Sequence, residues 1–215
     1  MKNNFLFAVL IFFTTTATAQ TDTTSKFYIG MAKQVAIVDT AFTPPTMQKL
    51  YNSFERIANA EKGEWLPDYY MAYCLVMQAY QVDKSMVDDM CDHANLLLDR
   101  ADSLKGDASE IFVLRSMVCS ARIMVDPRTR GAKFGKMASV FLDSAEIHNA
   151  NNPRIELNRG QGLYYTPPMF GGGKNKAKPH FEVAIKKYDA SAPKSFIDPH
   201  WGRFRAQQLL DDCNK

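Results

Sequence analysis

A pattern of small residues recurs along the chain and constrains its fold more than any other feature. Each repeat has one small residue, followed by a small–large–small series at helical spacing. The single small residues lie 44 positions apart and are Ala72, Ser116 and Gly160. The series are Ala94-Leu98-Ala101, Ala138-Leu142-Ala145 and Ala177-Phe181-Ala184. Small residues let two helices approach closely, and the larger residue fills the seam between them. The pattern therefore predicts successive pairs of packed, antiparallel helices.

The clearest pair covers residues 152–188. Pro153 suits the first turn of a helix, where its missing N–H is no loss. Thr166-Pro167-Pro168 ends this helix, because a residue before a proline is pushed out of the α region. Gly171-Gly172-Gly173 allows a tight turn with positive φ angles. We expect the second helix of the pair to begin at Lys174.

The pair 152–188 resembles a tetratricopeptide repeat, with its small residue in the first helix and its Ala…Phe…Ala series in the second. The resemblance implies an all-α fold in which antiparallel helix hairpins stack as a right-handed superhelix with a C-terminal capping helix. A tetratricopeptide repeat has a period of about 34 residues. We expect the extra length here to form inserted connections between the two helices of each pair, all on one edge of the array.

The same hairpin is also similar to the T-component proteins of TRAP transport systems. Those proteins combine a tetratricopeptide-like fold with a Gly-Gly turn before an Ala…Phe…Ala helix. The matching residues here are Gly171-Gly172-Gly173 and Ala177-Phe181-Ala184. This resemblance implies an accessory role in handling a ligand.

Proline, glycine and apolar faces of helical period mark the other elements. The expected helices cover residues 27–40, 46–60, 66–80, about 84–104, 107–125, about 137–149, 153–165, 174–188 and 201–213. No segment reads convincingly as a strand. We expect a single helical domain over residues 26–215, preceded by a disordered segment at 20–25.

Residues 1–19 have the pattern of a secretory signal peptide. Lys2 supplies the positive start, residues 5–13 form an apolar run, and Ala17-Thr18-Ala19 is a small-residue cleavage site. The run is too short to span a bilayer as a helix, which argues against the alternative of a retained membrane anchor. We expect export to the periplasm, or secretion, with no transmembrane span left after cleavage.

N-terminal sequencing of the protein from its source cell is expected to show a chain that starts at Gln20, because the three parts of the signal coincide before that residue. A full-length product retained in the cytoplasm would contradict this prediction.

The charge balance and the cysteines exclude two classes of protein. The chain has 26 basic and 23 acidic residues, for a net charge of +3 that falls to +2 without Lys2. This balance is too even for a nucleic-acid-binding protein. The four cysteines, Cys74, Cys91, Cys119 and Cys213, lack the paired spacing of a zinc site. Cys74 and Cys119 fall on apolar helix faces as core residues, and a Cys74–Cys91 disulfide is the open alternative.

No set of residues indicates catalysis, a metal or a cofactor. The histidines are His93, His148, His180 and His200, and none has a partner four residues away. A Gly-x-Ser-x-Gly elbow is absent from the sequence. Gly171 to Lys174 suggests a phosphate loop, but Asn175 stands where Ser or Thr would hold magnesium, and no strand precedes it. A plain turn is favoured over an anion site at this helix N-terminus.

The resemblance also implies a binding groove, because the first helix of each tetratricopeptide repeat lines the concave face. Its lining positions here are Tyr69, Tyr73, Met117, Gln161 and Tyr164. These residues are apolar or aromatic with few charges, so a carboxylate clamp for peptides is not supported. The alternative is that a tight superhelix simply buries them.

Two of the expected inserted connections are basic. We expect them to lie side by side as a basic rim that attracts an acidic partner or an anionic ligand. The rim residues are Arg128, Arg130, Lys133, Lys136, Lys174 and Lys176.

These features predict an exported, non-catalytic binding protein with a tetratricopeptide-like fold. The main interpretation is a scaffold in an envelope protein assembly, which uses the groove or the basic rim for a protein partner. The alternative is an accessory of a transport system that holds a small apolar or anionic molecule. An open, flat face would favour the first, and a closed apolar cavity under the groove would favour the second.

Overall fold

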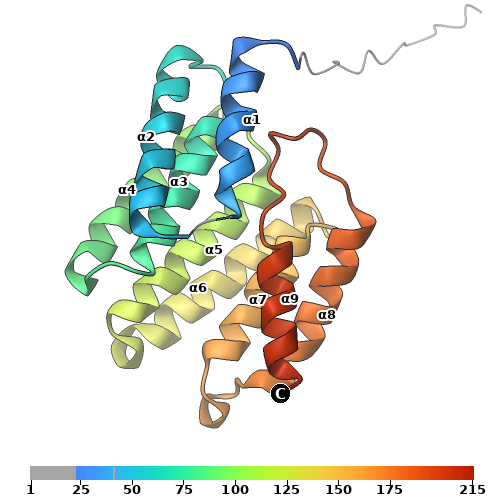
Figure 1. Cartoon of the computed structure of the whole chain (residues 1–215). Helices are drawn as coiled ribbons and strands as arrows, with labels where there is room; N and C mark the ends of the chain where they lie inside the picture. Colours follow the sequence, from blue (N-terminus) through green and yellow to red (C-terminus); the bar gives the residue numbers. More distant parts are fainter. Residues whose placement is uncertain (1–22, 41) are drawn as a thin grey trace, which may run out of the picture.

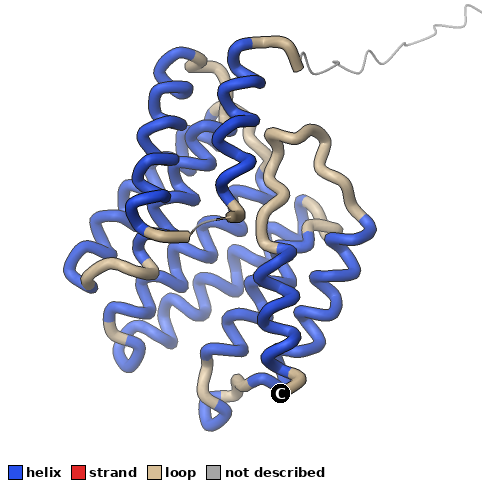
Figure 2. The backbone as a smooth tube through the Cα atoms, viewed as in Figure 1, coloured by secondary structure: helices blue, strands red, loops and turns tan. Residues whose placement is uncertain are grey.

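Residues 23–40 and 42–215 are described by a computed structural model, and within these ranges the chain forms nine α-helices and one short 3₁₀ helix. The elements are α1 (Lys26–Val38), α2 (Pro44–Ala60), α3 (Leu66–Ala79), α4 (Lys84–Ser103), α5 (Ala108–Val125), α6 (Pro127–His148), α7 (Pro153–Tyr165), η1 (Pro168–Phe170), α8 (Lys174–Ala190) and α9 (Arg203–Cys213). No strand occurs in the described ranges (Figure 2). The predicted all-α fold class is confirmed.

Short-range signals set where most of these helices begin. Side-chain oxygens of five residues accept hydrogen bonds of 2.9–3.2 Å from backbone N–H groups two or three positions further on. These residues are Ser25, Asp83, Asp107, Asp126 and Asn152. Each cap satisfies an N–H group that the helix itself leaves without a partner. Proline occupies the first turn of α2, α3, α6 and α7, where it removes no helical hydrogen bond.

The helices pack as antiparallel hairpins along one array. α3 packs against α4, α5 against α6 and α7 against α8, while α3, α5 and α7 also contact one another in turn. Figure 1 shows the connections α3–α4, α5–α6 and α7–α8 along the lower left edge of the molecule. α9 packs on α8 and closes the C-terminal end of the array. The predicted hairpins and C-terminal capping helix are therefore present.

Gly160 marks the closest approach within the α7–α8 hairpin. A Cβ atom built on Gly160 would lie 2.5 Å from Cε1 of Phe181, which is fully buried. The turn that follows α7 also depends on glycine, because Gly171 and Gly173 have φ angles of +88° and +105°. A Cβ on Gly172 would lie 2.1 Å from the carbonyl oxygen of Thr166. The expected close packing and the expected positive φ angles both occur in this hairpin.

The repeated small residues lie in the core. Ala72, Ser116 and Gly160 are all buried on the first helices of their hairpins. In the three series on the second helices, only Ala138 is half-buried, and the other eight residues are buried. The small residues, 44 positions apart on the first helices and in the first two series, thus identify packing positions of three successive hairpins.

The inserted connection expected between the second pair of helices is not observed. Asp126 alone separates α5 from α6, so residues 128–136 belong to α6 and do not form a loop. The extra length of the repeats lies in longer helices, since α4 has 20 residues and α6 has 22. The helix forms across Gly131 and Gly135 because Asp126 caps it and Pro127 occupies its first turn.

The N-terminal predictions fall mostly outside the described ranges. The signal peptide at 1–19 and its cleavage site lie there, as do residues 20–22 of the segment predicted to be disordered. Within that segment, Ser25 accepts a hydrogen bond from the Tyr28 backbone N–H at 3.1 Å and caps α1. Among the described helices, none combines the length and the apolar character needed to cross a bilayer.

The four cysteines are all free thiols in the structure. Cys74, Cys91 and Cys119 are buried, and Cys213 is half-buried. The predicted core role of Cys74 and Cys119 is confirmed, and the alternative disulfide between Cys74 and Cys91 is not formed.

Candidate functional site

The segment that connects α8 to α9 packs on two of the predicted groove residues, Tyr69 and Tyr73. Tyr69, Tyr73 and Met117 are buried, so they do not line an open surface. The ring of Trp201 packs against that of Tyr73 with a centroid distance of 4.8 Å, and its Nε1–H donates to the Tyr69 hydroxyl at 3.0 Å. These three residues therefore have the burial of the alternative interpretation, and the chain's own C-terminal segment covers Tyr69 and Tyr73.

α1 completes this cover. The backbone N–H of Gly202 donates to both carboxylate oxygens of Asp39, each at 3.4 Å, and so links the segment to the end of α1. The Tyr70 hydroxyl donates to the carbonyl oxygen of Ile197 at 3.0 Å. Figure 1 shows the segment descending beside α1 into α9.

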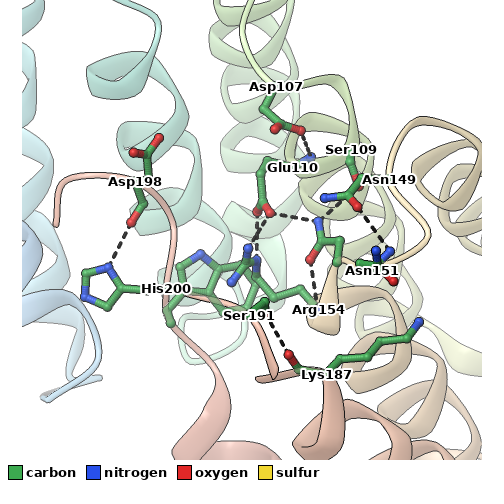
Figure 3. Close-up of polar contacts among 12 residues, drawn as sticks. Asp107, Ser109, Glu110, Asn149, Asn151, Arg154, Lys187, Ser191, Asp198 and His200 are labelled. Atoms are coloured by element: carbon green, nitrogen blue, oxygen red, sulfur yellow. Dashed lines mark hydrogen bonds and ion pairs between the residues drawn. The ribbon is translucent and has the colours of Figure 1, made fainter. Parts of the chain in front are cut away.

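A buried charged network lies beneath the segment (Figure 3). Glu110 of α5 accepts from Nε of Arg154 at 2.8 Å and also from the Nη2 group of Arg154. It further accepts from the Asn152 amide at 2.7 Å and from the Tyr69 hydroxyl at 3.0 Å. The Arg154 guanidinium lies 5.5 Å from the centroid of the Trp201 ring. This network joins α3, α5, α7 and the C-terminal segment, so it is structural.

Burial and charge act in opposite directions on Arg154. Removal from water alone would lower the pKa of Arg154, but the negative charge of Glu110 raises it above its usual value. The guanidinium therefore stays charged, and it needs its carboxylate partner.

Two hollows on the described surface are too small or too open to enclose an organic ligand. One, between α1 and the C-terminal segment, has a volume of about 10 Å³, which is roughly the space of a single water molecule. The other is an open depression of about 530 Å³ lined by His93, Leu96, Leu97, Asp99, Arg100 and Ser103. All of its lining residues belong to α4, so it has one wall.

The predicted basic rim is partly neutralised. Arg130 donates to both oxygens of Asp88 at 2.8 and 2.9 Å, and Lys174 forms an ion pair of 2.7 Å with Asp212. Lys133 lies 5.3 Å from the centroid of the Phe134 ring. Arg128, Lys133, Lys136 and Lys176 are exposed. All six side chains belong to helices α6 and α8, so the expected position on loops is wrong.

Each of the four histidine side chains contacts another group of the protein. Nδ1 of His180 lies 2.7 Å from Glu156, and Nδ1 of His200 lies 2.8 Å from the carbonyl oxygen of Asp198. His93 meets the Tyr51 hydroxyl at 3.4 Å, and His148 stacks on Phe112. Within the described ranges, no group of three or more His, Cys, Asp or Glu residues could hold a metal ion.

The other predicted groove residues, Gln161 and Tyr164, are half-buried on α7. The Tyr164 hydroxyl donates to the carboxylate of Asp212 on α9. This hydrogen bond to a negative acceptor raises the pKa of Tyr164 to about 12, with burial adding to the effect. The hydroxyl of Tyr164 is therefore held as a donor between α7 and α9.

The neighbouring Tyr165 has a different environment. Its side chain is 63% exposed, and its hydroxyl accepts a hydrogen bond of 2.5 Å from Nη2 of Arg205 on α9. The Tyr165 side chain therefore contacts the first turn of α9. Sequence reasoning named Tyr164 and missed Tyr165, although Tyr165 follows Gln161 by one helical turn on the same face.

An apolar turn follows directly. Met169 and Phe170 of η1 are 83% and 73% exposed. The ammonium of Lys176 reaches back over this turn, since its Nζ lies 3.9 Å from the position of a Cβ on Gly171. Exposed large apolar side chains beside cations suit a ligand that is both apolar and anionic.

Comparison with known proteins gives one informative likeness. The solved structure of the HusA haemophore from Porphyromonas gingivalis matches this chain with a TM-score of 0.80 and 39% sequence identity. The match covers 90% of this chain and 95% of the HusA chain. No family model and no curated protein gave a match.

Proposed function

Because this chain belongs to the family of the HusA haemophore, we propose that it is an exported binding protein for haem. A haemophore is a protein that captures and carries haem. The observation that carries the proposal is 39% identity over 95% of the HusA chain, which leaves little of either fold unmatched. Haem is here the cargo of a binding protein, and no catalytic role is proposed.

The chemistry of haem agrees with what this chain exposes. Haem is a flat apolar macrocycle with two carboxylates and an iron that accepts His, Cys, Met or Tyr. The described surface offers the exposed apolar side chains of Met169 and Phe170 in a turn that the cationic side chain of Lys176 approaches. A net charge of +3 also favours the approach of an anionic ligand.

This proposal replaces the scaffold interpretation with its alternative, a small-molecule-binding accessory. Of the residues predicted to form a protein-binding groove, Tyr69, Tyr73 and Met117 are buried, and Trp201 packs on the first two. The basic rim becomes, in this proposal, a set of cations available to the haem carboxylates. We retain the tetratricopeptide-like superhelix as the description of the repeats, supported by the buried small residues of the hairpins.

Titration of the folded protein with ferric haem is expected to give a saturable shift of the haem absorbance, with a dissociation constant below about 1 μM, the equivalent of roughly −8 kcal/mol. The same titration in a denaturing concentration of urea controls for non-specific association, because the surface that binds haem exists only in the folded chain. A spectrum that remains that of free haem at saturating protein would overturn the proposal.

A further inference from the structure

We propose that the turn between α7 and α8 docks this protein on an anionic lipid bilayer, with Met169 and Phe170 inserted at the surface of the leaflet and Lys176 on the headgroup phosphates. We call residues 166–173, which connect the two helices, the tip turn. Docking on a bilayer goes beyond the proposed function, because it is a second interaction and does not require haem.

The tip turn holds two large apolar side chains outside the core. Met169 and Phe170 are two of the three most exposed large apolar side chains among the described residues, and the third is Ile147. Neither Met169 nor Phe170 packs against the hydrophobic core. Single exposed apolar residues are common, but neighbouring ones with no contact to the core mark a surface that another molecule covers.

Backbone hydrogen bonds fix the shape of the tip turn. The N–H of Gly173 donates to the carbonyl oxygen of Leu163 at 2.8 Å, and the N–H of Phe170 donates to that of Pro167 at 2.9 Å. Pro167 and Pro168 also have restricted φ angles. The two apolar side chains are therefore presented by an ordered turn, and little conformational entropy is lost when they bind.

The charge around the tip turn is positive. The sequence has no acidic residue between Glu156 and Glu182. Lys174 is paired with Asp212 at 2.7 Å. Lys176 is exposed, forms no ion pair with another described residue, and places its Nζ over the turn. A free ammonium beside exposed apolar side chains suits anionic headgroups above an apolar layer.

A second connection on the same edge has the same character. Figure 1 shows the α5–α6 connection along the lower left edge together with the tip turn. Met124 before it is 44% exposed, Arg128 after it is exposed, and residues 127–142 contain no acid. The α3–α4 connection differs, because Asp83 and Asp89 are exposed there. The proposed surface therefore comprises the tip turn and the α5–α6 connection.

The shape of the tip turn favours a bilayer over a small ligand. Neither of the two hollows described above includes a residue of this turn. A projecting turn cannot enclose a small molecule, whereas a leaflet accepts apolar side chains that project into it. Tyr165, exposed at the end of α7, adds an aromatic ring of the type enriched at membrane interfaces.

Sedimentation with lipid vesicles tests the inference, without haem and with protein purified after export and signal cleavage. The wild-type protein is expected to bind vesicles of equal parts phosphatidylglycerol and phosphatidylcholine about tenfold more tightly than vesicles of phosphatidylcholine alone, and added salt should reduce the difference. The double variant Met169→Ser with Phe170→Ser is expected to weaken binding to the mixed vesicles by about 100-fold, or about tenfold for each apolar side chain.

The matched apolar control is Val140→Ser with Ile147→Ser, which also removes two exposed apolar side chains. Ile147 is as exposed as Met169 but lies at the opposite end of α6 from the α5–α6 connection. Binding of this variant to the mixed vesicles should equal that of the wild-type protein.

A second pair of variants tests the charges. Arg128→Gln with Lys176→Gln is expected to weaken binding to the mixed vesicles by about tenfold. Lys62→Gln with Lys194→Gln removes two exposed cations from other connections and should change binding by less than about twofold.

Three results would overturn the inference. The first is equal binding of the wild-type protein to both kinds of vesicle, and the second is unchanged binding by the variant that lacks Met169 and Phe170. The third is a loss of haem affinity in that variant with its vesicle binding intact, which would assign the turn to haem. A protein that binds the mixed vesicles as expected but binds no haem would leave this inference standing while the proposed function fails.

Discussion

Replacement of Glu110 by Gln is expected to lower the free energy of unfolding by about 3–5 kcal/mol, the usual cost of removing one partner of a buried ion pair. Glu110 and Arg154 are both buried, and the Glu110 carboxylate is the only anionic hydrogen-bond partner of the guanidinium among the described residues. The variant leaves that charge without compensation in a site from which water is excluded. Urea denaturation monitored by circular dichroism measures the change.

Two controls separate this effect from a general loss of charge. Asp99→Asn removes one partner of the exposed Arg115–Asp99 pair, whose atoms are 2.7 Å apart, and should cost less than about 1 kcal/mol. The double variant Glu110→Leu with Arg154→Met removes both buried charges and should be more stable than Glu110→Gln. Equal stabilities for Glu110→Gln and Asp99→Asn would show that the network contributes little.

The variant Gly160→Leu is expected to lower the free energy of unfolding by about 1–3 kcal/mol, the usual cost of overpacking. Even a single Cβ atom at Gly160 would approach the Phe181 ring to 2.5 Å, and the ring is fully buried. The ring has little room to move, because protein interiors are close-packed. The two helices would have to separate, and thermal unfolding would show a lower midpoint.

Gly162 provides the matched control on the same helix. A Cβ on Gly162 would meet no other atom within 4 Å. Gly162→Leu should therefore leave stability unchanged or raise it by up to about 1 kcal/mol, since glycine is a poor residue inside a helix. If the two leucine variants had the same midpoint, the packing assigned to Gly160 would be wrong.

The candidate site was less accessible to prediction than the fold. The tetratricopeptide likeness placed Tyr69 and Tyr73 on an open concave face, yet Trp201 covers both. Trp201 and Tyr69 are 132 positions apart, and no periodic pattern in the sequence links them. Tyr165 was missed for a similar reason, because its distinguishing feature is a hydrogen bond to Arg205, 40 positions away.

The sequence by itself determined the helices, their caps and the hairpin packing positions. Asn152, Pro153 and the glycines around Gly172 act within a few residues, and the spacing from Ser116 to Gly160 repeats a local pattern. Such signals depend on local backbone geometry and on side-chain size, which can be read from the sequence directly.

Only the tertiary structure decided which surfaces stay open. The C-terminal segment fills the inner face because Trp201 and the buried Glu110–Arg154 pair meet there, and Tyr165 remains exposed because the segment does not cover it. Each of these contacts joins residues that are far apart in the chain. Their formation depends on how whole hairpins stack, since burial and pairing are properties of the assembled core and not of any one stretch.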